Sequence, residues 1–197
     1  MIFKDENGRT LDELISLNGK NALITGSAVG IGKAIANRFS EAGANLQLID
    51  IDDKKLDEVS REIASHGKKV ESYKIDLSTK HEIDELWKRL EGREPDILVN
   101  NAGIYPMKDF LDLDEPFFDK VLGINLKSTL WMCQNMIKTR VKKGGVIINV
   151  SSIEAILPFK SDMVHYDTSK AGMGHWSGKG QDPSGRLHQA SSQHHLR

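Results

Sequence analysis

The chain has little cysteine, which limits the ways in which its fold can be stabilised. Its 197 residues include one cysteine, Cys133, so no disulfide can form within the chain. Cys133 lies in an apolar stretch with helical spacing, where a packed core thiol is a better interpretation than a nucleophile. A chain of this length can build one domain with a substantial hydrophobic core without any covalent cross-link.

Blocks of like charge and long apolar runs are also absent. The 27 lysines and arginines are interspersed among 28 aspartates and glutamates, so no basic stripe suits nucleic acid or an anionic membrane. No stretch approaches the roughly 20 apolar residues that cross a bilayer. Lys4, Asp5, Glu6 and Arg9 lie where a signal peptide requires an apolar segment. We therefore expect a cytoplasmic α/β domain with no nucleic-acid or membrane partner.

Residues 21–36 combine a short apolar run, a glycine-rich turn and a pattern of small residues at helical spacing. Asn21–Thr25 predicts a buried strand, and Gly26, Gly30 and Gly32 follow it closely. Glycine permits unusual backbone angles and lets another group approach the main chain. A helix that begins near Gly30 presents unpaired N–H groups and partial positive charge. The pattern therefore predicts the phosphate-binding turn of a dinucleotide site.

Strand and helix patterns alternate along the chain after a polar N-terminal extension, residues 1–19, which contains a short helix at residues 11–17. Strands are predicted at residues 21–25, 44–50, 70–76, 96–100 and 146–150. Helices are predicted at residues 30–42, 53–65 and 80–90, and one or two helices at residues 116–142. This alternation predicts a doubly wound parallel sheet with helices on both faces. Ligands bind such a sheet where its strands end, which is here at Thr25, Asp50, Asp76, Asn100 and Ser151–Ser152.

Asp50 closes the second predicted strand, 18 residues after Gly32. An acid near this interval accepts hydrogen bonds from the ribose hydroxyls of an adenosine, although without the glycine turn a solvated acid would be the better interpretation. The same carboxylate would repel a 2′-phosphate, and no lysine or arginine lies beside it before Lys54. The pattern therefore favours NAD over NADP.

Tyr166 and Lys170 are four residues apart, so they share one face of a helix. A phenol with a pKa of roughly 10 is a poor base at neutral pH, and a nearby ammonium group lowers that pKa. The spacing alone is common on helical surfaces. Its position after the fifth strand, with Ser152 at the end of that strand, favours a catalytic interpretation.

Together these residues resemble the short-chain dehydrogenase/reductase family with its Tyr-x-x-x-Lys active site. The resemblance covers roughly residues 18–173, in family order. Its motifs are Thr25-Gly26-x-x-x-Gly30-x-Gly32, Asp76-Leu77, Asn100-Asn101-Ala102-Gly103, Asn125, Val150-Ser151-Ser152 and Tyr166-x-x-x-Lys170. The interval from Ser152 to Tyr166 is one residue longer than is usual in the family, which a small loop insertion explains.

The resemblance implies hydride transfer between a nicotinamide and a secondary alcohol or ketone. It implies that Tyr166 exchanges a proton with the substrate oxygen and that Ser152 hydrogen-bonds this oxygen. Lys170 would lower the pKa of Tyr166 and contact the nicotinamide ribose, and Asn125 would hold a water in a proton relay with Lys170. Asp76 would face the adenine. The implied cofactor-binding residues are Gly26, Ser27, Gly30, Ile31, Gly32, Asp50, Asp76, Leu77, Asn100, Ala102, Gly103, Tyr166 and Lys170.

The resemblance leaves the substrate open. Residues 16–20, followed by Leu23–Ser27, look somewhat like sugar-acid dehydrogenases of the gluconate type, and a 3-oxoacyl reductase is another possibility. Family members mostly assemble as dimers or tetramers through the helix before the fifth strand and the Tyr166 helix. The resemblance therefore implies a homo-oligomer that acts on a small alcohol or carbonyl compound.

The character of the sequence changes after Met173, so the incomplete catalytic domain is placed at residues 20–173. Residues 174–197 contain four of the seven histidines, few apolar residues and no helical or strand period, which predicts a disordered tail outside the resemblance. The histidine spacing matches no metal-ligand pattern. Because the family's C-terminal strands are lacking, we expect a chain truncated or frameshifted after about residue 173. The alternative to an active oxidoreductase is an inactive cofactor-binding fragment with an exposed sheet edge.

Overall fold

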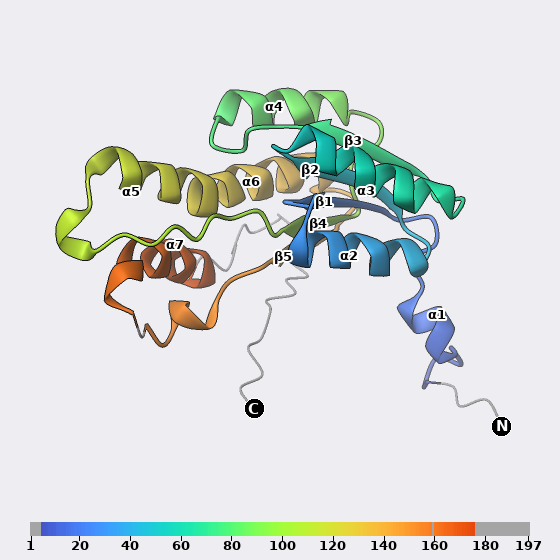
Figure 1. The fold of residues 1–197 in the computed structure, drawn as a ribbon. Helices are drawn as coiled ribbons and strands as arrows, with labels where there is room; N and C mark the ends of the chain where they lie inside the picture. The colour runs from blue at the N-terminus through green and yellow to red at the C-terminus, as the bar shows by residue number, and fades with distance from the viewer. Residues whose placement is uncertain (1–4, 159, 176–197) are drawn as a thin grey trace.

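The structure, a computed structural model, describes residues 5–158 and 160–175. A parallel sheet with the strand order β3-β2-β1-β4-β5 runs through it, with helices on both faces (Figure 1). The strands are β1 (Asn21–Thr25), β2 (Asn45–Asp50), β3 (Val70–Lys74), β4 (Ile97–Asn100) and β5 (Val146–Asn149). The doubly wound α/β class is confirmed, and β3 forms one edge of the sheet.

The helices follow the predicted alternation. They are α1 (Leu11–Ile15), α2 (Gly30–Glu41), α3 (Asp53–Ser65), α4 (Lys80–Arg89), α5 (Glu115–Leu122), α6 (Ser128–Arg140) and α7 (Val164–His175), with short 3-10 helices η1 (Phe110–Asp112), η3 (Ile153–Ala155) and η4 (Ser161–Met163). Thr10 and Glu13 form a capping box at the start of α1. The segment predicted as one or two helices over 116–142 is α5 and α6 joined by a π-helical turn, η2 (Gly123–Lys127).

The two faces of the sheet carry separate hydrophobic clusters because successive strand residues point to opposite sides. On one side, α2 and α3 pack Ala36, Leu56 and Val59 against Ala22, Ile24 and Leu46. On the other side, α4 and α6 pack Leu86, Trp87, Met132 and Cys133 against Leu23 and Leu98. Cys133 is fully buried, and burial raises the pKa of its thiol to about 12, which confirms a packed core thiol.

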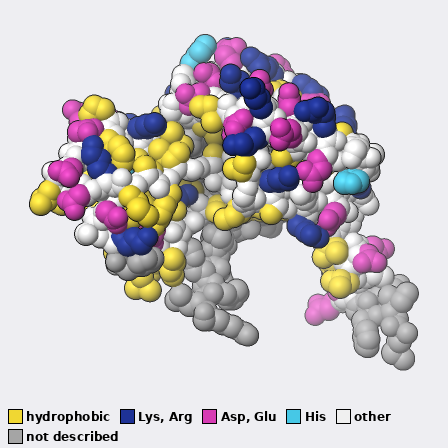
Figure 2. Space-filling model, in the orientation of Figure 1, with side chains coloured by type: hydrophobic (Ala, Val, Ile, Leu, Met, Phe, Trp, Pro, Cys, Tyr) yellow, Lys and Arg dark blue, Asp and Glu magenta, His cyan; other side chains and the backbone are white. Residues whose placement is uncertain are grey.

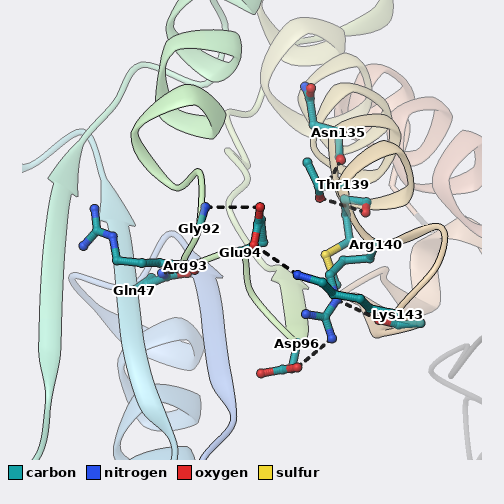
Figure 3. A network of polar contacts seen from close by, with 11 residues as sticks. Gln47, Gly92, Arg93, Glu94, Asp96, Asn135, Thr139, Arg140 and Lys143 are labelled. Carbon is teal, nitrogen blue, oxygen red and sulfur yellow. Dashed lines mark hydrogen bonds and ion pairs between the residues drawn. The ribbon is translucent and has the colours of Figure 1, made fainter.

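A polar network braces the amino-terminal end of the sheet, opposite the strand ends that carry the motifs (Figure 3). The Arg140 guanidinium, at the end of α6, contacts Asp96 at 2.6 Å and donates from Nε to the carbonyl of Gly144 at 2.7 Å. The second oxygen of Asp96 accepts from the backbone N–H of Asn21 at 2.9 Å. Arg140 therefore ties α6 to the starts of β1 and β4 and to the turn before β5.

β5 forms one edge of the described sheet, and its four residues are partly exposed whereas those of β4 are buried. The predicted tail begins at Gly174, but α7 continues through His175, and residues 176–197 lie outside the described part of the chain. None of the helices in the described residues is long and apolar enough to cross a membrane.

Candidate active site

The glycine turn after β1 has the backbone geometry that the sequence pattern predicts. Gly26 and Gly30 adopt positive φ angles of 64° and 56°, a region that side chains disfavour. A Cβ on Gly32 would lie 2.0 Å from the Gly26 carbonyl oxygen, so only glycine lets the start of α2 pack onto the turn. A Cβ on Gly26 would lie 2.8 Å from the Cα of Ala102. The turn therefore packs tightly against both the start of α2 and the segment after β4.

The start of α2 is suited to an anion. Its N-cap, Val29, is extended and makes no side-chain capping hydrogen bond, so no side chain competes for the first N–H groups of the helix. The apolar side chains of Val29, Ile31 and Ile51 beside the turn are more than half exposed. Exposed apolar groups around an anion-binding helix start suit a ligand with both phosphates and flat rings. These residues fit a dinucleotide.

Ser27 and Asn101 hold the turn in place rather than presenting their side chains outward. Ser27 is fully buried, and both its N–H and its hydroxyl donate to the carbonyl of Ile49 at 3.1 Å. Asn101 Nδ2 donates to the carbonyls of Thr25 and Gly26 at 3.0 Å each. Thr25 Oγ1 in turn accepts from the N–H groups of Asn101 and Ala102 at 3.0 Å. Ser27 was expected to contact the cofactor, whereas Asn101 stood in a quoted motif without an assigned role.

Asp50 lies at the end of β2 beside the turn, as the sequence predicted. One carboxylate oxygen accepts from the N–H of Ala28 at 2.9 Å, and the other accepts from the N–H of Asp52 at 3.0 Å. A carboxylate has about four lone-pair positions, so two hydrogen bonds leave acceptor capacity for a ligand hydroxyl. The half-buried carboxylate of Asp50 thus holds the turn in place and keeps acceptor capacity beside it.

Three other predicted cofactor residues lie at the strand ends with differently directed side chains. Asp76 Oδ1 accepts from Ser78 at 2.9 Å, and Leu77 is buried in the core. The buried side chain of Asn100 donates to Cys133 Sγ at 3.2 Å and to Asn149 Oδ1 at 2.9 Å. The Asn100 amide therefore joins β4 to β5 and α6 inside the protein, so only its backbone can line a ligand.

Asn125 lies in the π-helical turn η2 and is fully buried. Its Nδ2 donates to the Ile104 carbonyl and to Ser169 Oγ at 3.0 Å each, and its Oδ1 accepts from the Ile104 N–H at 2.8 Å. Gly103 packs closely against the Asn125 side chain, because a Cβ there would lie 3.3 Å from Asn125 Oδ1 and 3.4 Å from Lys170 Nζ. π-Helical turns are frequent at functional sites. The side chain thus clamps the helix, the segment after β4 and α7 together, and the expected water relay stays a prediction.

Ser152 and Tyr166 meet although they come from different segments. Ser152 is the N-cap of η3, and its Oγ accepts from the N–H of Glu154 at 3.2 Å. Ser152 lies close enough to Tyr166, in the first turn of α7, for its hydroxyl to lower the pKa of the phenol. The ring of Tyr105 stands edge-on to the Tyr166 ring, with 4.5 Å between centroids and 83° between planes.

The expected lowering of the Tyr166 pKa by Lys170 stays a prediction. Burial raises the pKa of the Tyr166 phenol, and the Ser152 hydroxyl only partly opposes this, while Glu154, Tyr105 and Asp167 raise it further. Lys170 is itself 4% exposed, and burial lowers its pKa to about 8. Its Nζ donates to the Val150 carbonyl at 2.9 Å and lies 5.8 Å from the Tyr166 ring centroid. The ammonium is therefore directed at the end of β5 rather than at the phenol.

Two residues at this site were missed in the sequence: Glu154, which is buried, and Tyr105, whose hydroxyl donates to Glu154 Oε1 at 3.0 Å. An acid inside the apolar run from Ile153 to Leu157 was the only available signal for Glu154. No local pattern marks Tyr105, because its partners lie about 50 residues further along the chain.

Exposed apolar side chains surround the Ser152–Tyr166 pair. We call this set the apolar rim; its members are Tyr105, Met107, Phe110, Ile153, Ile156 and Leu157. They come from the segments after β4 and β5, and η1 packs beside η4 while η3 packs against α7. Figure 2 shows hydrophobic side chains gathered over the part of the molecule that holds α5 and α7, whereas charged side chains dominate over α3 and α4.

Comparison with known proteins agrees with this arrangement. The family model for short chain dehydrogenases matches residues 20–185. The chain belongs to this family. The matched range ends at residue 185, whereas the resemblance was expected to end near residue 173. Short chain dehydrogenase relatives therefore provide the frame for comparing substrates and cofactors.

Three similar proteins differ in what they act on. The chain is 34% identical to a 3-oxoacyl-[acyl-carrier-protein] reductase of Aquifex aeolicus over 165 residues, 81% of this chain and 65% of that protein. Identity, span and both coverages are the same for an NADP-dependent L-rhamnose 1-dehydrogenase of Thermoplasma acidophilum. A solved 7α-hydroxysteroid dehydrogenase, complexed with NADH and a 7-oxo bile acid conjugate, superposes with a TM-score of 0.77 at 33% identity, covering 82% of this chain and 64% of that one. The chain spans less than two thirds of the length of the first curated relatives it matches.

Proposed function

We propose that the chain is an oxidoreductase that transfers hydride between a nicotinamide cofactor and a secondary alcohol or ketone. The observation that carries this proposal is the convergence of Ser152, Tyr166 and Lys170 at the end of the sheet that also holds the glycine turn. Family membership supports the same activity, because the relatives named above are dehydrogenases and reductases.

Tyr166 and Ser152 handle the proton and the oxygen of the substrate. In the direction of alcohol oxidation, the Tyr166 phenolate takes the hydroxyl proton while the Ser152 hydroxyl donates a hydrogen bond to the developing carbonyl oxygen. The bound nicotinamide supplies the acceptor for the hydride that leaves the carbinol carbon. In the reverse direction the Tyr166 phenol returns its proton to the oxygen as the carbonyl is reduced.

Lys170 supplies a second titratable group behind Tyr166. With a pKa of about 8, its amine can exchange protons near neutral pH, and its Nζ is held by the carbonyl of Val150. We assign it contact with the nicotinamide ribose and a place in the proton path behind Tyr166. Asn125 holds the segments on either side of Lys170 together and contributes to the same path through a bound water.

The cofactor preferred is NAD rather than NADP. Asp50 holds a carboxylate at the end of β2 beside the glycine turn, where it would accept from ribose hydroxyls and repel a 2′-phosphate. Gly26, Gly30, Ile31 and Gly32 would form the bed of the pyrophosphate, and Asp76, Ala102 and Gly103 would lie along the nucleoside groups.

The substrate is a small alcohol or carbonyl compound with an apolar part. A sugar-acid substrate and a 3-oxoacyl substrate both fit the chemistry of Tyr166 and Ser152. The apolar rim favours the 3-oxoacyl type, because exposed aromatic and aliphatic side chains bind an acyl chain better than a polyol. We further propose a cytoplasmic homo-oligomer, a dimer or tetramer, whose size light scattering after gel filtration would measure.

The alternative is a catalytically inactive cofactor-binding fragment. Calorimetric titration with NADH, combined with turnover of a panel of secondary alcohols and 3-oxoacyl thioesters, separates the two. Binding together with turnover supports the oxidoreductase, whereas binding without any turnover supports the fragment. Absence of NADH binding in a folded chain would contradict both.

A further inference from the structure

Glu154 is a buried carboxylate beside the proposed catalytic pair, and its hydrogen bond comes from a neutral phenol rather than from a cation. It lies two residues after Ser152 in η3, with 4% of its surface exposed. Its Oε1 accepts from the Tyr105 hydroxyl at 3.0 Å. Burying a carboxylate is costly unless its partners compensate, so a glutamate in this position calls for a functional explanation.

The backbone of Glu154 fixes Ser152. The Glu154 N–H donates to Ser152 Oγ at 3.2 Å, which restricts the serine side chain to one direction at the end of β5. The Ser152 hydroxyl keeps its own proton for a second partner, and Tyr166 lies close enough for this proton to favour its phenolate form. Glu154 therefore positions the Ser152 hydroxyl through its backbone N–H.

The side chain of Glu154 fixes Tyr166 through Tyr105. Tyr105 is 43% exposed and would otherwise be free to rotate away from the site. With its hydroxyl held by Glu154, its ring stands edge-on to Tyr166 at 4.5 Å between centroids. This contact limits the movement of the Tyr166 ring.

We propose that Glu154 is a positioning residue for Ser152 and Tyr166 and that its negative charge disfavours the phenolate form of Tyr166. The catalytic part of this inference rests on the proposed function. The effect of the charge on Tyr166 is a property of the folded chain and does not require turnover.

Other titratable groups also face Tyr166. Glu154 approaches from η3, Tyr105 from the segment after β4, and Asp167 and Lys170 from α7. Burial is the largest cause of the raised Tyr166 pKa, and Glu154 is the first of the charged groups that add to it. Removing the Glu154 charge therefore lowers the Tyr166 pKa without returning it to that of a free phenol.

Phenolate absorbance in the near ultraviolet tests the charge directly. The chain contains three tyrosines, so subtracting the titration of Tyr166→Phe from that of the parent chain isolates Tyr166. We expect Glu154→Gln to move this titration down by about one pH unit. The exposed carboxylate of Glu85 provides the matched control, since Glu85→Gln removes a charge on α4. Circular dichroism at each pH confirms that the chain is folded.

A second variant separates position from charge. Glu154→Gln keeps an oxygen for the Tyr105 hydroxyl, so kcat at its own optimum stays near that of the parent, with the pH profile shifted down. Glu154→Asp keeps the charge but is one methylene too short to reach Tyr105, so we expect kcat to fall about tenfold. Its Tyr166 titration should remain near that of the parent, with KM little changed. A purely structural role would alter stability without this division between the two variants.

An unchanged Tyr166 titration in folded Glu154→Gln overturns the inference. If that variant does not fold, Glu154→Asp decides, because a kcat equal to that of Glu85→Gln would contradict a positioning role. If the parent chain shows no turnover, the proposed function fails, but the titration of folded Glu154→Gln still supports or overturns the effect of the charge.

Discussion

Single side chains at the strand ends carry the proposed cofactor preference and the protonation states of the site. Asp50 was predicted from its distance to the glycine turn, and the structure brings it to the turn. The Tyr166 environment was not predicted, because a spacing of four residues reports a shared helix face but not the depth of burial. Burial is the largest cause of the shift, and it raises the pKa of Tyr166.

Asp50→Ser should change the cofactor preference. Removing the carboxylate removes the repulsion of a 2′-phosphate and the acceptor for ribose hydroxyls, so the ratio of NADPH to NADH affinity should rise by about tenfold or more. Calorimetric titration with both cofactors measures this ratio. Asp52→Ser, which removes the N-cap acid of α3 two residues away, is the control. An Asp50→Ser ratio equal to that of the control would contradict the assigned role.

Lys170 makes stability depend on pH in a specific direction. Its folded pKa of about 8 lies below the ordinary 10.5, so the unfolded chain binds more protons between these values and stability rises with pH across that window. The shift corresponds to about 3 kcal/mol. Urea unfolding gives the free energy of unfolding of the parent chain and of Lys170→Met. The difference between the two should change by about 3 kcal/mol from pH 7 to pH 11. A difference that is constant with pH would show that Lys170 is not desolvated.

At the level of secondary-structure elements, the turn between β1 and α2 is the most constrained connection in the site. Its strand and helix starts agree with the sequence pattern, because a continuous buried run followed by positive-φ glycines leaves few alternatives. The π-helical turn before α6 was not predicted, since a local change in backbone hydrogen bonding leaves the apolar pattern intact. Asn125 could be placed on a helix, but its burial and its three hydrogen bonds depend on segments distant in sequence.

Gly32→Ala should disrupt the turn. The new Cβ would lie 2.0 Å from the Gly26 carbonyl, so the helix start must move, and we expect a loss of about 1–3 kcal/mol of stability and of NADH binding. Gly123→Ala is the matched control, because a Cβ there meets nothing within 4 Å and the residue is helical. Denaturant midpoints and calorimetry measure both. Equal stability and affinity in the two variants would refute the close packing of the turn.

Across the whole molecule, the site occupies one end of the sheet and a polar brace occupies the other. Arg140→Ala removes the hydrogen bonds to Asp96 and Gly144 and should cost about 1.5–3 kcal/mol in the free energy of unfolding. Lys143→Ala is the control, because its exposed contact with Glu94 is 3.9 Å long and should contribute less than about 1 kcal/mol. Similar midpoints of urea unfolding for the two variants would contradict the brace.

The doubly wound parallel sheet and the convergence of the motifs could be predicted because every β–α unit has its own local pattern and the crossover rule limits how the units combine. The pairing of Tyr105 with Glu154 and the apolar rim could not, because they arise where separate segments meet after folding. The sequence predictions for residues 176–197 stay predictions, since those residues lie outside the described part of the chain.

The proton transfer assigned to Tyr166 is the central claim, and the Tyr166→Phe variant tests it most directly. The phenylalanine keeps the ring that Tyr105 contacts but has no hydroxyl, so kcat should fall by about 10²–10⁴-fold while the Kd for NADH stays within about threefold. Steady-state turnover of the best substrate from the panel, with NADH affinity measured on the same preparation, provides both values. A kcat in Tyr166→Phe equal to that of the parent chain would contradict the account.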